Sequence, residues 1–149
     1  MSDLDTALAL NNAHKVETGF LTTPELAALL SSAFHAVAQA DQLLITLDQD
    51  AAYDSPNFRW FKTQYARFVY IDRVIVVPQA RGQGLARTLY LGLFAQARAA
   101  GHDRIVCEIN LDPPNPGSLA FHDALGFVEV GRALLANGKT VSYRMLSLG

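Results

Sequence analysis

Hydrophobic and polar residues follow two different periods in the second half of the chain. From residue 85 to residue 100 the apolar positions recur every fourth residue, at Leu85, Leu89, Leu93 and Ala97. This spacing indicates one face of a helix, and Gly101 is suited to ending it. From residue 104 to residue 111 the pattern alternates, with Ile105, Cys107, Ile109 and Leu111 on one face and Arg104, Val106, Glu108 and Asn110 on the other. The alternation predicts a strand directly after the helix.

Shorter apolar runs, bounded by turn and capping residues, predict the other elements. We expect strands over Leu4–Leu10, Phe34–Ala38, Leu43–Leu47, Phe68–Val77, Phe127–Arg132 and Thr140–Leu148. We expect a loop after Asn11-Asn12, a helix with Thr23 as N-cap, an aromatic-rich helix or loop that begins at Ser55-Pro56, and a helix over Pro116–Leu125 that ends at Gly126. The second and third strands would form a hairpin, although Phe34–Ala38 could instead prolong the helix before it.

The order of these elements predicts the fold class. Antiparallel strands come first, and a strand-helix-strand-helix-strand unit follows, so we expect a mixed α/β sheet. The chain of 149 residues shows no internal repeat and no Gly/Ser-rich linker. We therefore expect a single domain over residues 1–149.

Composition and charge narrow the function classes. With a net charge of -2, the chain lacks the excess of basic residues that a dedicated nucleic-acid or anionic-membrane binder needs. Cys107 is the single cysteine, so the chain has neither an intramolecular disulfide nor a Cys/His cluster at metal-binding spacing. The acidic first residues are unlike a secretory signal, and no apolar run approaches the ~18 residues of a membrane span. We expect a cytoplasmic protein with no metal and no contact with nucleic acid or membrane.

Gly82 and Gly84 lie between a predicted strand and the clearest predicted helix. Small residues there let backbone N–H groups converge on an anion, and the helix start adds partial positive charge, so the segment can form a phosphate-binding loop. A dinucleotide fingerprint is excluded because Arg87 stands where its third glycine belongs, and a Walker loop is excluded because Gly-Lys-Ser/Thr is missing. The alternative is a tight turn that only needs glycine.

Two segments around this loop resemble a known family. Residues 76–89 include Arg81, Gly84 and Ala86 at the positions of the Arg/Gln-x-x-Gly-x-Gly/Ala motif of the GCN5-related N-acetyltransferase (GNAT) family. Residues 115–127 are similar to the family's Asn-x-x-x-x-x-Phe-Tyr-x-x-Leu-Gly-Phe segment. The two motifs occur at the expected separation. The resemblance implies a mostly antiparallel sheet with a splayed parallel strand pair, flanked by helices.

The resemblance also implies acetyl transfer from acetyl-coenzyme A to an amine of a small molecule or peptide. The pantetheine arm would lie along the strand at Val74–Val76, and N–H groups of residues 82–87 would bind the pyrophosphate. The implied coenzyme-binding residues are Val74, Ile75, Val76, Arg81, Gly82, Gln83, Gly84, Leu85, Ala86, Arg87, Asn115 and Ser118. Asn115 could also be the N-cap before Pro116. Dimers are frequent in that family, which leaves a homodimer open.

Three residues are candidates for proton transfer. Glu108 matches a position that some relatives use as general base, with a surface pairing to Arg104 as the alternative. Asp72 is the second candidate base, with an ion-paired or exposed carboxylate as the alternative. His122 stands where many relatives have tyrosine. Its imidazolium form, with a pKa near ~6.5 against ~8.5 for a thiol, could protonate the leaving thiolate, whereas the alternative is a surface histidine.

Other interpretations stay open. The aromatic residues between 58 and 70 could form a wall for an apolar acceptor, or they could be core. The missing tyrosine allows a second function class, a non-catalytic acyl-coenzyme A sensor or regulatory module. A third possibility is a structural α/β domain that binds no coenzyme.

Overall fold

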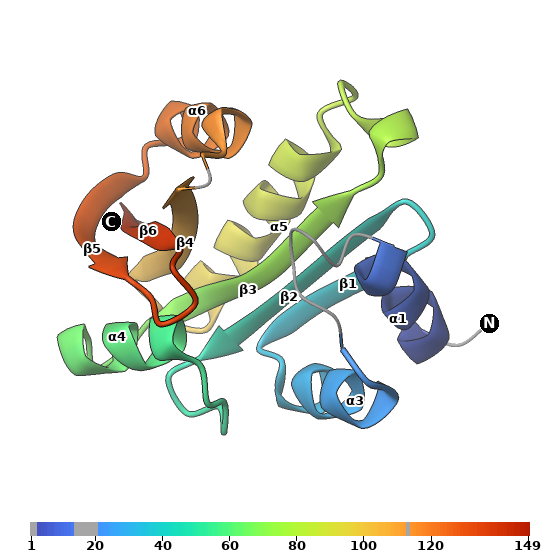
Figure 1. Ribbon diagram of the computed structural model, residues 1–149, viewed down its shortest axis with the longest axis horizontal. Helices are drawn as coiled ribbons and strands as arrows, with labels where there is room; N and C mark the ends of the chain where they lie inside the picture. The colour runs from blue at the N-terminus through green and yellow to red at the C-terminus, as the bar shows by residue number, and fades with distance from the viewer. Residues whose placement is uncertain (1–2, 14–20, 113) are drawn as a thin grey trace.

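A mixed sheet lies at the centre of the fold, as the order of the elements predicts. The structure is a computed structural model that describes residues 3–13, 21–112 and 114–149. Within these ranges the sheet has six strands in the order β1-β2-β3-β4-β6-β5, and β3 with β4 is its parallel pair (Figure 1). The elements are α1 (Asp3–Ala13), α3 (Thr23–Ser32), β1 (His35–Gln39), β2 (Gln42–Asp48), α4 (Pro56–Gln64), β3 (Val69–Val76), a 3-10 turn (Pro78–Ala80), α5 (Leu85–Ala99), β4 (Arg104–Asp112), α6 (Pro116–Leu125), β5 (Val128–Leu134) and β6 (Thr140–Ser147).

Helices cover both faces of the sheet and create two cores. On one face, side chains of α1, α3 and α4 such as Leu26 and Phe58 pack with Tyr70 of β3. On the other face, side chains of α5 such as Leu93 pack with Ile105 of β4 and with Phe127. The inner strands are therefore buried on both sides, and Val106, expected on a polar face, is fully buried.

The parallel strands β3 and β4 separate after a short paired segment. In the described residues their register contains two pairs, Val69 with Ile105 and Tyr70 with Val106. Beyond these pairs, β3 stays bonded to β2 as far as Val76, and β4 stays bonded to β6 as far as Asp112. The two strands diverge beyond these pairs (Figure 1). This confirms the predicted splayed pair.

A β-bulge at Asp72 redirects the side chains of β3. The register with β2 passes from Arg73 opposite Ile45 to Ile71 opposite Thr46, which leaves Asp72 as the extra residue. The bulge lets two consecutive side chains meet, and Arg73 Nε donates to Asp72 Oδ2 at 2.6 Å. A second Arg73 nitrogen, Nη1, donates to Asn11 Oδ1 at 2.8 Å. The bulge thus builds a buried ion pair next to the opening between the strands.

The predicted first strand over Leu4–Leu10 is wrong, because this segment belongs to helix α1. Its buried residues Ala7, Leu10 and Asn11 are three and four positions apart, which places them on one helical face. That face packs against α3 and the first two strands. Asn11 and Asn12 are helical too, and the loop predicted after them falls on residues 14–20, which lie outside the described ranges.

The predicted helix near residue 23 is confirmed with a shifted cap. Thr22 is the N-cap in place of Thr23, since Glu25 N–H donates to Thr22 Oγ1 at 3.3 Å. Thr22 N–H in turn donates to Glu25 Oε1 at 3.0 Å, which completes a capping box. The hairpin of β1 and β2 is confirmed, so Phe34–Ala38 does not prolong this helix.

Candidate functional site

Three adjoining cavities run along the space between β3 and β4. The first, of about 370 Å³, is lined by residues that include Glu108 and Tyr70. The second, of about 320 Å³, is lined by Val74–Val76 of β3, and the third, of about 350 Å³, by residues of the glycine loop. Neighbouring cavities share lining residues: Asn115 belongs to the first and second, and Ala86 to the second and third. The three cavities therefore connect the glycine loop with Glu108.

The glycine loop has the open backbone that an anion site needs. Gly82 and Gly84 have φ values of 81° and 75°, and a Cβ built on either would meet no atom within 4 Å. Gly84 is the N-cap of α5, so the first N–H groups of this 15-residue helix have no partner within the helix. Arg81 Nε donates to Val76 O at 3.0 Å and ties the loop to the end of β3. The space above both glycines and the helix start fit a phosphate group.

The predicted coenzyme-binding residues gather in the second and third cavities. The second cavity has Val74, Ile75, Val76, Arg81, Ala86, Asn115 and Ser118 in its lining. The third has Gly82, Gly84, Leu85 and Arg87, while Gln83 lines none of the three cavities. Asn115 also acts as the N-cap of α6, because its Oδ1 accepts from Ser118 N–H at 3.2 Å. Its two predicted roles are therefore compatible.

Glu108 lies in the first cavity with tyrosine as its partner. The Tyr70 hydroxyl donates to the Glu108 carboxylate and lies 3.0 Å from Oε2. Burial raises the pKa of Glu108 to about 8; the Tyr70 hydrogen bond opposes this shift, and the charge of Asp72 adds to it. Arg104, the alternative partner, bonds instead to the carbonyl of Arg67 and lies over the ring of Tyr65. Glu108 is thus a carboxyl group whose proton exchanges near neutral pH.

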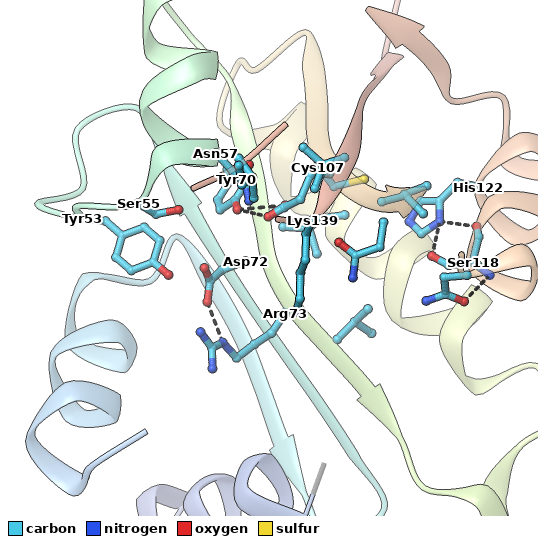
Figure 2. Close-up of a pocket in the computed structure, with 18 of the residues that line it drawn as sticks. Tyr53, Ser55, Asn57, Tyr70, Asp72, Arg73, Cys107, Ser118, His122 and Lys139 are labelled. Carbon is cyan, nitrogen blue, oxygen red and sulfur yellow. Dashed lines mark hydrogen bonds and ion pairs between the residues drawn. The ribbon is translucent and has the colours of Figure 1, made fainter. Parts of the chain in front are cut away.

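Asp72 lines the same cavity but is paired. Its side chain is 3% exposed and forms the 2.6 Å ion pair with Arg73, as the alternative interpretation expected. Figure 2 shows this pair on one side of the cavity and His122 with Ser118 on the other. Asp72 therefore acts on the site through its charge, which disfavours ionisation of Glu108.

His122 is buried, so the alternative of a surface histidine is wrong. It is 5% exposed, and its Nδ1 lies 2.7 Å from the carbonyl oxygen of Ser118. Its Nε2 lies 2.8 Å from the hydroxyl of Tyr90 on α5. Burial lowers the pKa of His122, so the neutral ring predominates at pH 7.

Two tyrosines of the site were not predicted from the sequence. Tyr70 belongs to the aromatic residues between 58 and 70, and Tyr90 lies beside the apolar stripe of α5. A usable signal existed for Tyr90, because it follows Ala86 of the loop motif by four residues and so lies on the same face of α5. Phe58, Phe61 and Phe68 are fully buried in the core, which supports the core interpretation of that cluster.

The described residues hold no cluster of three or more His, Cys, Asp or Glu that could bind a metal. None of the helices in the described ranges is both long enough and apolar enough to cross a membrane.

Comparison with known proteins identifies the family. The chain is 38% identical over 65 residues to phosphinothricin N-acetyltransferase of Alcaligenes faecalis, which covers 44% of this chain and 32% of that enzyme. The structure is similar to Ard1 from Thermoplasma volcanium, with a TM-score of 0.73, 11% identity and coverage of 99% of this chain and 93% of the other. It is also similar to yncA from Salmonella typhimurium with its cofactor acetyl-CoA, with a TM-score of 0.65, 19% identity and coverage of 100% and 91%. Residues 51–127, more than half of the sequence, match the acetyltransferase (GNAT) family, and the chain therefore belongs to this family.

Proposed function

We propose that this chain transfers an acetyl group from acetyl-coenzyme A to an amine by direct transfer. The observation that carries the proposal is the series of three cavities that joins the glycine loop to Glu108. Such a path suits a long substrate whose phosphates bind at one end and whose acyl group reacts at the other. Membership of the acetyltransferase family supports the same reaction.

The glycine loop and β3 would hold the coenzyme. The open space above Gly82 and Gly84 would receive the pyrophosphate, with N–H groups of residues 82–87 as donors. The free edge of β3 at Val74–Val76 would pair with the pantetheine arm in the manner of an added strand. Asn115 and Ser118, at the start of α6, would contact the arm from the opposite wall.

Glu108 would act as the general base in the first cavity. An amine attacks only when it is neutral, so the site must remove a proton from the incoming ammonium group or from the nitrogen after attack. A carboxyl group with a pKa of about 8 suits this task, because a base is most effective when its pKa is near the operating pH. Asp72, held by Arg73, is the second candidate.

The acceptor can be found by a screen for thiol release. We would mix the chain and acetyl-coenzyme A with phosphinothricin, spermidine or a peptide that begins with a free alanine, and measure free thiol. We expect thiol release that depends on one of these amines. Coenzyme binding without release in any mixture would favour the alternative, a non-catalytic acyl-coenzyme A sensor. A failure to bind acetyl-coenzyme A in calorimetry would contradict both functions.

We also propose that the protein is cytoplasmic and forms a homodimer. Cys107 is buried and free, which suits a reducing compartment such as the cytoplasm. A homodimer is the assembly that we propose to test by sedimentation.

A further inference from the structure

Both ring nitrogens of His122 are already engaged. A carbonyl oxygen can only accept a hydrogen bond, so the 2.7 Å contact with Ser118 O requires a hydrogen on Nδ1. In the neutral ring Nε2 is then the acceptor, and the Tyr90 hydroxyl donates to it at 2.8 Å. His122 therefore has no free nitrogen to offer to a substrate in the cavity. Figure 2 shows the bonds on its Ser118 side.

Tyr90 lines the space for the bound substrate that we propose, together with His122. It lines both the first and the second cavity, at the place where these two adjoin. Its ring is held by edge contacts with Phe94, Phe121 and Phe127 at centroid distances of 6.0, 5.1 and 6.2 Å. The hydroxyl oxygen keeps lone pairs beyond its bond to His122, so it can receive a proton on one side while it donates one on the other.

We propose that Tyr90 gives the proton to the departing thiolate and that His122 acts through Tyr90 as a positioning residue that holds the hydroxyl. This inference rests on the proposed acetyl transfer. It moves the acid predicted at residue 122 to a hydroxyl on the neighbouring helix. The charged and titratable groups around the pair are Asp123 on α6, Arg144 on β6, and Cys107 and Glu108 on β4.

The proton transfer balances without a further reactant. The amine nitrogen bonds to the acetyl carbon, the carbon–sulfur bond breaks, and its electron pair goes to sulfur. Sulfur takes the proton of the Tyr90 hydroxyl as that hydroxyl turns away from Nε2 of His122. His122 stays neutral throughout, with the hydrogen on Nδ1 that the 2.7 Å contact with Ser118 O requires. The amine proton goes to Glu108, and water carries it from there to the Tyr90 oxygen.

The test is the substitution Tyr90→Phe, which keeps the ring and removes the hydroxyl. We expect kcat with the best of the three amine probes to fall about 100-fold, the low end of general-acid contributions, while the Kd for acetyl-coenzyme A changes less than twofold. His122→Phe should lower kcat by a similar factor. The double variant should lose no more than either single one, because the two residues act as a unit. Tyr65→Phe is the matched control, since Tyr65 lines none of the three cavities.

A titration of His122 by NMR gives a readout that does not depend on turnover. Loss of the Tyr90 donor destabilises the neutral ring, so Tyr90→Phe should raise the pKa of His122, and Tyr65→Phe should not. An active wild type with an equally active Tyr90→Phe variant overturns this role of Tyr90 and leaves the proposed function in place. An unchanged His122 pKa in Tyr90→Phe also overturns this role. A wild type that releases no thiol with any probe overturns the proposed function, and the titration still decides whether Tyr90 donates to His122.

Discussion

At the scale of single residues, the surroundings of Glu108 set the pH at which the site works. Its pKa of about 8 lies far above the ordinary 4.5, so the carboxyl group is mostly protonated at pH 7. Only the carboxylate can accept a proton. The rate of acetyl transfer should therefore rise with pH and level off above about pH 8.

The substitution Glu108→Gln isolates this effect. We expect a lower kcat and a loss of the Glu108-dependent rise, because glutamine does not titrate. The measurement is the pH–rate profile at saturating acetyl-coenzyme A, with Tyr65→Phe as the control that keeps the wild-type profile. A Glu108→Gln profile with the same midpoint and plateau as the wild type would transfer the role to Asp72.

All the predicted site residues except Gln83 line the cavities, but the partners of the catalytic candidates could not be predicted. Glu108 and His122 were identified by position, whereas Tyr70 and Tyr90 donate to them from 38 and 32 residues away. These contacts depend on the register of β3 with β4 and on the rotation of α5, and neither leaves a local pattern in the sequence. The hydrogen bonds that tune Glu108 and His122 can therefore be known only from the fold.

At the scale of elements, residues that end a helix distinguish the correctly predicted helices from the segment 4–10, which was wrongly predicted as a strand. Helices α5 and α6 are followed by Gly101 and Gly126 in left-handed conformation, with the paired hydrogen bonds typical of a Schellman motif. The segment 4–10 has no such signal, and its short apolar run fits a strand or a helix equally well. Contact with α3 and β1 is what makes it helical in the fold.

Substitution of two glycines by alanine, one in a strand and one in a helix, should change the stability in opposite directions. A Cβ on Gly131 of β5 would lie 2.5 Å from the Trp60 ring, which stacks on Tyr143 at 4.1 Å. Gly131→Ala should therefore lower the free energy of unfolding by ~1–3 kcal/mol. Gly92 is on the exposed side of α5 with no atom within 4 Å of its Cβ, so Gly92→Ala should raise it by ~0.5–1 kcal/mol. Urea unfolding measures both changes. A Gly131→Ala variant as stable as the wild type would show that the Trp60 ring can shift without an energetic cost.

At the scale of the whole molecule, one interruption of the sheet creates the site. The divergence of β3 and β4 opens the space, the bulge at Asp72 places charge beside it, and α5 begins at its far end. Sequence motifs marked the far end, because a phosphate-binding loop requires particular residues at particular spacings. The opening itself has no motif, since it results from strand pairings that stop after Tyr70 and Val106.

Coenzyme binding along this opening should stabilise the entire fold. Acetyl-coenzyme A at 100 times its Kd adds ~2.7 kcal/mol to the free energy of unfolding, which raises the Tm by about 5–10 °C for a chain of this size. Gly84→Val should abolish this ligand-dependent rise. Gly138→Val is the matched control, because Gly138 also has positive φ (86°) and open surroundings but lines none of the cavities. Gly138→Val should lower the Tm through similar backbone strain, yet acetyl-coenzyme A should still raise the Tm of this variant. A rise retained in Gly84→Val would place the coenzyme elsewhere.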